Sequence, residues 1–339
     1  MFINQFNLKF IILDFVMSGH NYESLIIYDP YYKLFSGMPK PEFMLIGAAK
    51  SGTTSFSSYL SLHPQVRECI PKEPNYWAWK RCDRQQYQDL FVNSMPILSP
   101  GPKQVIGGEY STDSLLHPLV PRRVRGRLPD LKIIVLLRNP IARAYSHFIM
   151  SQRDGRETAH SFDDVTKKEM EEIPVLLESH MRGFLDPDHL TREHCSMPGG
   201  LPIPVFNHDD KWTPRFLRTD TDLLLFYYTS CIFRSLYHDQ VWRWLQLYPR
   251  EQVMIIQSEE FFINKINIMN KVVQFLNLQP FNFDSVGLKK TWCGGASNDF
   301  EKPGDYVPMK DETRKLLNDY FSPFNDKLFS LIDEQYDWQ

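Results

Sequence analysis

The sequence predicts an α/β fold in which a single domain is built around a central parallel sheet flanked by helices. Short apolar segments rich in leucine and β-branched residues alternate along the chain with helical segments, a pattern that produces parallel sheets. Glycine, arginine and glutamate stand at or directly after the ends of these segments, where ligands bind in such sheets. With 339 residues, of which 42% are hydrophobic, the chain is long enough to bury a substantial core.

The first predicted strand and helix enclose a loop that is suited to binding phosphate. Residues 43–46 form the strand, small residues at 47–52 allow backbone N–H groups to surround an anion, and residues 55–62 continue as a helix. In the common ATP-binding loop a lysine follows the last glycine, and the next Ser or Thr binds Mg²⁺. Here Lys50 precedes Gly52, and two threonines follow the glycine. The loop is therefore P-loop-like, but its sequence indicates phosphate binding without a metal.

Arginine stands at the end of the clearest buried strand, residues 131–137. Nucleoside triphosphate enzymes place a metal-binding carboxylate at such a strand end, whereas this strand is followed by Arg138. Pro140 suits the first turn of the next helix, which carries Ser146 about two turns after the strand. We expect the Arg138 guanidinium and the Ser146 hydroxyl to bind one phosphate, because the planar fork of arginine suits that anion.

The remaining elements follow the same alternation. A short strand is predicted at 105–110, a helix at 234–248, a strand at 253–256 and a helix at 311–321. Residues 155–218 are polar and contain several prolines. We interpret this range as an insertion or a lobe on the substrate side of the domain.

These motifs resemble the sulfotransferases that use 3′-phosphoadenosine 5′-phosphosulfate (PAPS). The loop with Lys50, followed by Arg138 and Ser146, carries the resemblance, which covers residues 41–339 and is most similar to the Golgi carbohydrate sulfotransferases that modify heparan or chondroitin chains. In that family the first motif holds the 5′-phosphosulfate and the second holds the 3′-phosphate. The resemblance implies PAPS as the donor, no metal, and the following donor-binding residues: Lys50, Ser51, Gly52, Thr53, Thr54, Ser55, Arg138, Ser146, Trp292 and Lys302.

Sulfuryl transfer to a hydroxyl needs a base for the acceptor proton and a cation for the leaving phosphate. Lys50 is the predicted cation. Glu73 lies in a Lys-Glu-Pro-Asn-Tyr-Trp segment that resembles the glycan sulfotransferases, in which the glutamate is the base. Two alternatives are a surface Glu73 that pairs only with Lys72, and a histidine base at His63 or His117, since small-molecule sulfotransferases with a similar donor site use histidine.

The acceptor implied by the resemblance is a carbohydrate of the glycosaminoglycan type, and no nucleic acid is expected as a partner. A net charge of −3 gives no overall attraction for an anionic polymer, so a local basic patch has to bind it. We expect acceptor contacts from Lys72, Lys80, Arg81 and Glu109, although Glu109 has the alternative role of orienting the catalytic lysine. Four arginines in residues 122–127 offer a second basic patch, for which we favour a solvated helix face.

The N-terminal segment, residues 1–40, contains an apolar stretch that is too short to span a membrane. Lys9 and Asp14 interrupt this stretch, and about 20 apolar residues are needed to cross a bilayer. The resemblance implies the Golgi lumen, with membrane association only through a missing or atypical N-terminal anchor, and a cytoplasmic location stays open. The five cysteines lack the spacing of a zinc site, which leaves buried reduced thiols or a bridge from Cys293 to a distant cysteine.

Two other functions fit parts of the pattern. A P-loop nucleotide or small-molecule kinase is disfavoured, because the Gly-Lys-Ser/Thr sequence is missing and Arg138 follows the buried strand. A catalytically silent glycan-binding protein would keep the fold and the phosphate loop without turnover. Measurements of donor binding and of turnover distinguish these functions from sulfuryl transfer.

Overall fold

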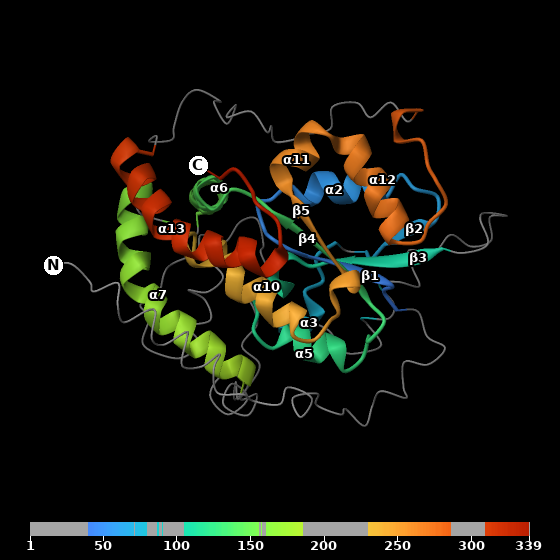
Figure 1. Cartoon of the computed structure of the whole chain (residues 1–339), viewed down its shortest axis with the longest axis horizontal. Coiled ribbons are helices and arrows are strands. Elements are labelled where there is room, and N and C mark those ends of the chain that lie inside the picture. Colours follow the sequence, from blue (N-terminus) through green and yellow to red (C-terminus); the bar gives the residue numbers. More distant parts are fainter. Residues whose placement is uncertain are drawn as a thin grey trace.

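A five-stranded parallel sheet forms the centre of the molecule, as the sequence predicts (Figure 1). The computed structural model describes residues 40–70, 72–79, 87, 90, 105–155, 157, 161–185, 230–285 and 309–338. The strands lie in the order β2-β3-β1-β4-β5, and every neighbouring pair is parallel. Their bounds are Phe43–Gly47 for β1, Val66–Glu68 for β2, Ile106–Tyr110 for β3, Lys132–Leu137 for β4 and Val253–Gln257 for β5.

β1 lies in the middle of this sheet, where the chain crosses from one side to the other. Strands β2 and β3 lie on one side of β1, and strands β4 and β5 lie on the other. Leu45 of β1 pairs with Tyr110 of β3 and with Ile134 of β4. In parallel sheets, ligands bind beyond the carboxyl ends of the strands at such a point. The loop that follows β1 therefore starts where the fold favours a binding site.

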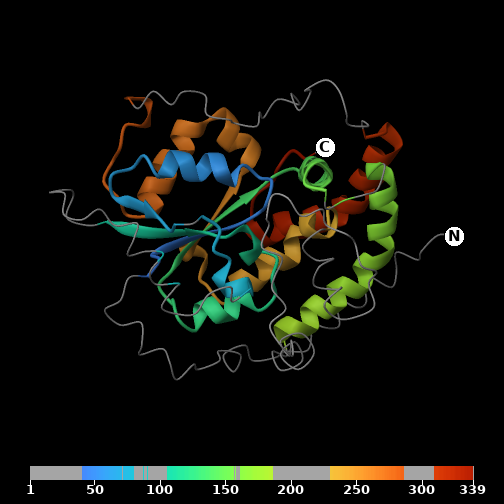
Figure 2. The ribbon, with the colours of Figure 1, turned by 180° about the vertical axis from the view of Figure 1, so that it is seen from behind.

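Helices cover both faces of the sheet (Figures 1 and 2). One face carries α2 (Thr53–Leu60), α11 (Ser258–Ile263) and α12 (Lys265–Phe275). The other face carries α3 (Tyr76–Trp79), α5 (Val120–Arg125) and α10 (Tyr237–Leu245). The sheet is thus the middle layer of three.

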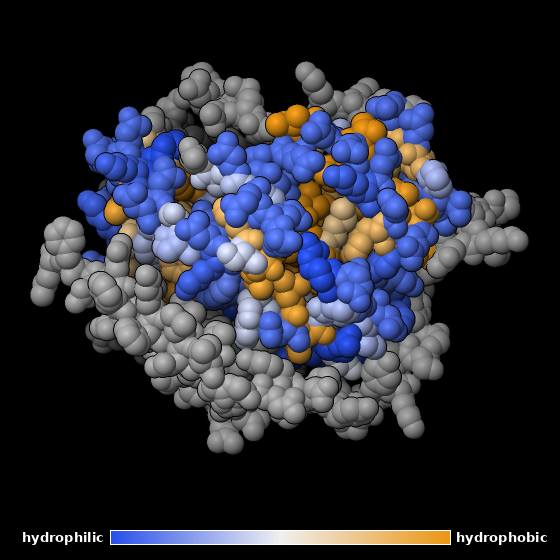
Figure 3. Space-filling view, in the orientation of Figure 1, coloured by the Kyte–Doolittle hydropathy of each residue, from blue (hydrophilic) through white to orange (hydrophobic). Residues whose placement is uncertain are grey.

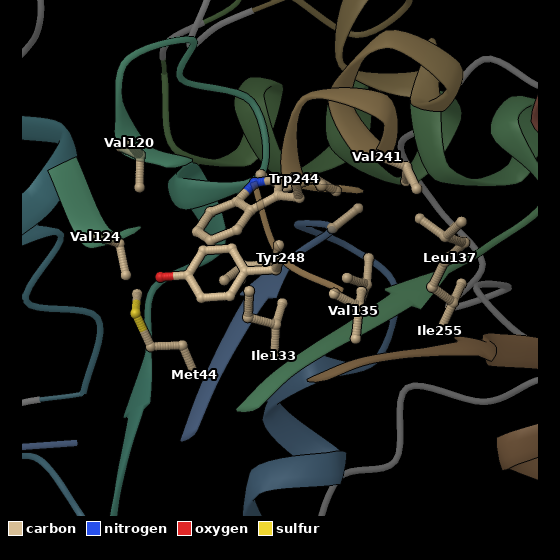
Figure 4. Close-up of a cluster of buried hydrophobic side chains, with 14 of the residues drawn as sticks. Met44, Val120, Val124, Ile133, Val135, Leu137, Val241, Trp244, Tyr248 and Ile255 are labelled. Carbon is tan, nitrogen blue, oxygen red and sulfur yellow. The ribbon is translucent and has the colours of Figure 1, made fainter. Parts of the chain in front are cut away.

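Alternate residues of each strand face opposite layers. In β1, Leu45 packs toward α2 and α12, whereas Met44 packs toward α5 and α10. Figure 4 shows the rings of Trp244 and Tyr248 on the face of the sheet that carries α5 and α10, where they lie near the sheet residue Ile133. Because both faces of the sheet are covered, the central strands β1 and β4 appear in the sequence as nearly continuous apolar runs.

A third apolar cluster lies where β4 leads into α6. It joins α6 (Pro140–Arg153), α7 (Phe162–Leu185), η4 (Phe233–Ser235) and α13 (Asp311–Ile332), helices that lie together in Figure 2. Phe162 and Ile173 of α7 are buried in this cluster, although α7 belongs to the range predicted as an insertion. The substrate-side lobe as a whole stays a prediction, since residues 186–229 lie outside the described part of the chain.

Two helices in the second half of the chain, α10 and α13, have bounds that differ from the predicted ones. α10 begins at Tyr237 rather than at 234, because Leu236 has a non-helical ψ of 78° that separates α10 from η4. α13 continues to Ile332 rather than ending at 321, although Pro323 lies inside it. Proline removes one backbone N–H from a helix, but the buried residues Phe324 and Leu328 follow on the core-facing side. Packing of the later turns therefore outweighs the local effect of proline.

The arginine run of α5 packs against the protein instead of facing water. Arg122 is only 6% exposed. Arg123 Nη1 donates a hydrogen bond to the Trp77 carbonyl oxygen at 2.6 Å, and the Arg125 guanidinium lies 5.2 Å from the centre of the Tyr248 ring. The prediction of a solvated helix face is wrong, because carbonyl oxygens and ring faces of neighbouring segments bind these guanidinium groups.

The face of the molecule in Figure 3 is mostly hydrophilic over its described residues, and hydrophobic residues are visible mainly toward its centre. α7 and α13 are the longest described helices, with 24 and 22 residues, and both carry charged residues along their length. Within the described ranges, no helix combines the length and the apolar character needed to cross a membrane.

Candidate active site

The loop between β1 and α2, together with the first turn of α2, forms the anion loop, which we define as residues 47–54. Lys50 and Gly52 have φ angles of 72° and 84°, which lie in the left-handed region. The φ of Gly52 favours glycine, and a Cβ atom there would lie 2.5 Å from Phe262 Cζ, so a larger residue would also force the Phe262 ring to move. α2 begins at Thr53, two residues earlier than predicted. The first N–H groups of a helix have no acceptor inside it, and here they follow directly on the loop.

Three side chains from other elements hold consecutive carbonyl groups of the anion loop. Arg143 Nη1 donates to the Ala49 oxygen at 3.4 Å, Arg138 Nη1 to the Lys50 oxygen at 3.2 Å, and Ser258 Oγ to the Ser51 oxygen at 2.8 Å. In a trans peptide, the N–H of the next residue points opposite to the carbonyl. The N–H groups of Lys50 and Gly52 are therefore turned away from these three side chains. The contacts set the backbone direction that an anion cradle needs.

Positive charge accumulates at the anion loop. Burial lowers the pKa of Lys50, and the positive charges of Arg153, Arg138 and Arg143 lower it further, with Asp154 opposing them. Burial also lowers the pKa of Arg143 to about 10. Like charges held together in a partly buried site are costly unless anions accompany them. The loop is therefore suited to a ligand that carries several negative charges.

The second predicted motif begins where β4 ends. α6 starts at Pro140, as predicted, and the Asn139 side-chain oxygen accepts hydrogen bonds from the N–H groups of Ile141 and Ala142, both at 3.0 Å. This N-cap fixes the direction of the helix. Arg138 reaches the anion loop, and Ser146 is buried on α6. Their joint binding of one phosphate stays a prediction.

Lys72 connects the predicted base to the anion loop. Its Nζ donates a hydrogen bond to Thr54 Oγ1 at 3.1 Å and lies 3.9 Å from Glu73 Oε1. The structure thus brings Lys72, Glu73 and the loop together in one place. The ion pair expected as an alternative to the base role is present, and it is part of the same site.

Glu73 has a backbone and an environment that are typical of functional residues. Its φ is 60°, and that of Asn75 is 48°, so two non-glycine residues of this short segment are left-handed. Strained backbone of this kind persists where the surroundings enforce it, often at active sites. Burial raises the pKa of the Glu73 carboxyl, and the positive charge of Lys72 partly offsets this. A glutamate with a raised pKa is a better proton acceptor near neutral pH.

Glu109 does not lie where an acceptor contact was expected. Its side chain has no exposed surface. Its carboxylate accepts hydrogen bonds from Trp77 Nε1 at 3.1 Å, from Ser111 Oγ at 2.7 Å and from the Tyr87 hydroxyl. The predicted acceptor contact is wrong in this structure, because these donors enclose the carboxylate. Lys50 is not among these donors, and a role of Glu109 in orienting that lysine stays a prediction.

The two histidines considered as bases are held by structural contacts. His63 is buried, its Nδ1 accepts a hydrogen bond from the Gln65 N–H at 3.1 Å, and its Nε2 lies 2.9 Å from the Gln279 oxygen. This arrangement occupies both ring nitrogens. His117 is also buried, and its Nδ1 accepts a backbone N–H. Glu73, which is 40% exposed, is the more accessible base.

Four predicted site residues lie outside the described part of the chain, and their roles stay predictions: Lys80, Arg81, Trp292 and Lys302. Sequence reasoning missed Ser258 and Arg143, which both hold the anion loop. Ser258 comes directly after β5, so the strand-end rule that identified Arg138 also applies to it. Arg143 contacts a carbonyl 94 positions away, for which the sequence contains no local signal.

The described residues include two of the five cysteines. Cys69 and Cys231 are both buried, which agrees with one of the two states that the sequence leaves open. In the portion of the chain that the structure describes, no three His, Cys, Asp or Glu side chains form a group able to hold a metal ion.

Known proteins resemble this chain over most of its length. The model of the sulfotransferase domain matches residues 40–286. The chain is 24% identical over 341 residues to the membrane-associated sulfotransferase kil1 of Dictyostelium discoideum, covering 88% of this chain and 66% of the relative. It is 26% identical to carbohydrate sulfotransferase 15 of Homo sapiens (88% and 54% covered) and 26% identical to the bifunctional heparan sulfate N-deacetylase/N-sulfotransferase 2 of Homo sapiens (86% and 29% covered). The chain thus spans less than two thirds of the length of these relatives.

Among solved structures, the crystal structure of a sulfotransferase from Alicyclobacillus acidocaldarius has a TM-score of 0.58 to this chain at 24% identity, with 88% of this chain and 98% of that one covered. At this identity the likeness concerns the fold, and it agrees with the single α/β domain described above. The family model covers well over half of the chain, which confirms the resemblance inferred from the anion loop and Arg138. The chain belongs to the sulfotransferase domain family.

Proposed function

We propose that this protein transfers a sulfuryl group from PAPS to a hydroxyl group of a carbohydrate acceptor of the glycosaminoglycan type. Membership of the family supports sulfuryl transfer. The carbohydrate acceptor is supported by two relatives whose names specify carbohydrate and heparan sulfate. The observation that carries the proposal is the contact of Lys72 with Thr54, which puts Glu73 beside the cationic anion loop.

The donor set of the site fits the charges of PAPS. This donor carries a phosphosulfate at one end of its ribose and a phosphate at the other. Following the family motifs, we assign the phosphosulfate to the anion loop and the 3′-phosphate to Arg138 and Ser146, with Trp292 and Lys302 completing the donor site. The fit rests on a cluster of cations, hydroxyls and helix N–H groups, with an arginine where β4 ends.

In the proposed reaction, the acceptor hydroxyl oxygen attacks the sulfur in line with the bond that breaks. A bond forms between that oxygen and sulfur, and the bond from sulfur to the bridging phosphate oxygen breaks. Glu73 takes the hydroxyl proton, and Lys50 balances the negative charge that develops on the departing phosphate. Lys72 stabilises the ionised form of Glu73 at 3.9 Å before the proton is transferred.

Donor binding tests the first half of this proposal. We expect 3′-phosphoadenosine 5′-phosphate (PAP) to raise the melting temperature clearly, and ATP with Mg²⁺ to raise it much less. Lys50→Ala should reduce the PAP effect. Lys271→Ala is the control, because Lys271 is an exposed lysine on α12 that pairs with Glu260. Equal shifts by PAP and by ATP with Mg²⁺ would favour the kinase alternative.

Turnover with labelled PAPS tests the second half, using desulfated heparan and desulfated chondroitin as separate acceptors. We expect Glu73→Gln to lower kcat about 10²- to 10⁴-fold, the range of a lost general base. Glu260→Gln is a matched control, because Glu260 lies 3.9 Å from Lys271 and is 42% exposed, compared with 3.9 Å and 40% for Glu73. Unchanged turnover in Glu73→Gln would refute its role. PAP binding without turnover on either glycan would indicate a silent glycan-binding relative.

The proposal includes the Golgi lumen as the site of action, as the family resemblance implies. Immunofluorescence of the full-length protein with a Golgi marker tests this location. A diffuse cytoplasmic signal would contradict it.

A further inference from the structure

A buried hydrogen-bond network lies behind the segment that carries Glu73. Ser111 Oγ accepts a hydrogen bond from the Asn75 N–H at 3.1 Å and donates one to Glu109 Oε1 at 2.7 Å. The second carboxylate oxygen of Glu109 accepts from Trp77 Nε1 at 3.1 Å. The network therefore holds the segment at two points, which lie two and four residues after Glu73.

The segment depends on such support because its backbone is strained. Glu73 and Asn75 have φ angles of 60° and 48°, a left-handed region that is unfavourable for most non-glycine residues. Within the described residues 72–79, Asn75 Nδ2 donates a hydrogen bond to the Glu73 oxygen at 3.3 Å. Asn75 is itself buried, so loss of the Ser111 hydroxyl would leave its N–H without an acceptor.

Glu109 and Ser111 have no direct access to an acceptor. Both side chains are completely buried. Glu109 stands near the end of β3, whose backbone pairs with the central strand β1, so the network connects the segment to the rigid sheet. The Tyr87 hydroxyl adds a further donor to the Glu109 carboxylate and closes the network on its other side.

We infer that Glu109 and Ser111 are positioning residues that hold Glu73 at the anion loop, an inference that rests on the proposed role of Glu73 as the base. The strand-end glutamate thus belongs to the site without touching donor or acceptor. Loosening the network lets Glu73 leave its place beside Lys72, while the anion loop keeps its own supports from Arg138, Arg143 and Ser258. The network therefore controls kcat, and donor affinity does not depend on it.

Ser111→Ala tests this inference, with Ser114→Ala as the matched control. Ser114 lies three residues later in η3 (Thr112–Ser114) and is completely buried, and its hydroxyl has no hydrogen-bond partner in the part of the chain that the structure describes. We expect hydrogen exchange of the peptide covering residues 72–79 to become faster in Ser111→Ala and to stay unchanged in Ser114→Ala. We also expect Ser111→Ala to lower kcat about 10- to 100-fold on the desulfated glycan that is turned over, since a displacement of about 1 Å has effects of that size. The rise in melting temperature produced by PAP should be preserved.

A double variant shows whether Ser111 acts through Glu73. In the Glu73→Gln background, Ser111→Ala should cause no further loss of kcat, because the base it positions is already absent. Glu109→Gln is the second variant if Ser111→Ala does not fold, since glutamine keeps the size of the side chain but places a donor where Ser111 donates. Its expected effects on exchange and kcat are the same.

The inference would be overturned if Ser111→Ala or Glu109→Gln had the same exchange rates and the same kcat as Ser114→Ala. It would also be overturned if the loss of kcat caused by Ser111→Ala persisted in full in the Glu73→Gln background. Full turnover by Glu73→Gln alone would refute the proposed role of Glu73 as the base instead. The exchange comparison would then still decide whether the network holds the segment.

Discussion

Replacing Gly52 with alanine measures how strongly the anion loop depends on the space around that glycine. The new Cβ would lie 2.5 Å from Phe262 Cζ and 3.1 Å from Phe262 Cε1, well inside contact distance. Gly155 provides a matched control, because its φ of 68° is close to the 84° of Gly52 and nothing lies within 4 Å of the Cβ it would receive. The two variants therefore share the backbone strain and differ in the steric contact.

The expected sizes of the two effects follow from these contacts. The left-handed conformation costs alanine about 1–2 kcal/mol at either position. Overpacking against Phe262 adds about 1–3 kcal/mol at Gly52 only. We expect the free energy of unfolding to fall by about 2–5 kcal/mol in Gly52→Ala and by about 1–2 kcal/mol in Gly155→Ala.

Urea denaturation and calorimetric titration with PAP measure the two consequences. Gly52→Ala should bind PAP at least about tenfold more weakly, because a displaced loop that loses about 1.4 kcal/mol of binding free energy produces that change. Gly155→Ala should keep its affinity. The double variant Gly52→Ala with Phe262→Leu should recover part of the stability and of the affinity. Equal losses of stability in both single variants, or no recovery in the double variant, would refute the steric reasoning.

Three further predictions concern single contacts. Ser258→Ala removes the hydrogen bond to the Ser51 oxygen, so we expect about 1 kcal/mol less binding energy and about fivefold weaker PAP binding by calorimetry; unchanged affinity would contradict this. Burial raises the pKa of Glu73, so the ionised carboxylate destabilises the folded state above that pKa, and this penalty vanishes below about pH 4.3. Glu73→Gln should therefore gain stability relative to the natural protein as the pH rises. A stability difference that stays constant with pH in urea denaturation would argue against this reasoning. Burial opposes ionisation of Asp163, but hydrogen bonds from Lys310 and Thr313 lower its pKa. Asp163→Asn should therefore be less stable than the natural protein at pH 7, and this difference should disappear as the pH falls through the pKa of folded Asp163. Equal stability at pH 7 would show that the hydrogen bonds to Asp163 do not stabilise the fold.

Much of the fold was predictable because its signals are local. β4 is buried on both faces, so its residues form an unbroken apolar run, and the predicted strand at 131–137 agrees with the observed Lys132–Leu137. The anion loop was predictable for the same reason, since its strand, its small residues and its helix are adjacent in the chain. Element ends were less predictable, as α13 shows, because packing carries that helix past Pro323.

The candidate site was predictable only in part, because burial depends on distant segments. Glu73 and Glu109 are both glutamates near predicted strands, and nothing in their immediate sequence indicates that Glu73 is partly exposed whereas Glu109 is buried. The donors to Glu109 come from positions 22 and 32 residues earlier and from two residues later. The arginine run shows the same effect, because the hydrogen bond that Arg123 donates goes to the carbonyl oxygen of Trp77, which lies 46 positions away in the sequence.

The sequence by itself determined the parallel α/β fold, the anion loop with its lysine before the last glycine, and the arginine after the central apolar strand. These features depend on the period of apolar residues and on the conformational freedom of glycine, which act over a few neighbouring positions. Only the tertiary structure decided that Lys72 joins Glu73 to Thr54, that Ser258 reaches Ser51 across 207 positions, and that Glu109 lies inside the protein. The reason is physical: the solvation and the partners of a charged side chain are set by whichever segments the fold packs around it.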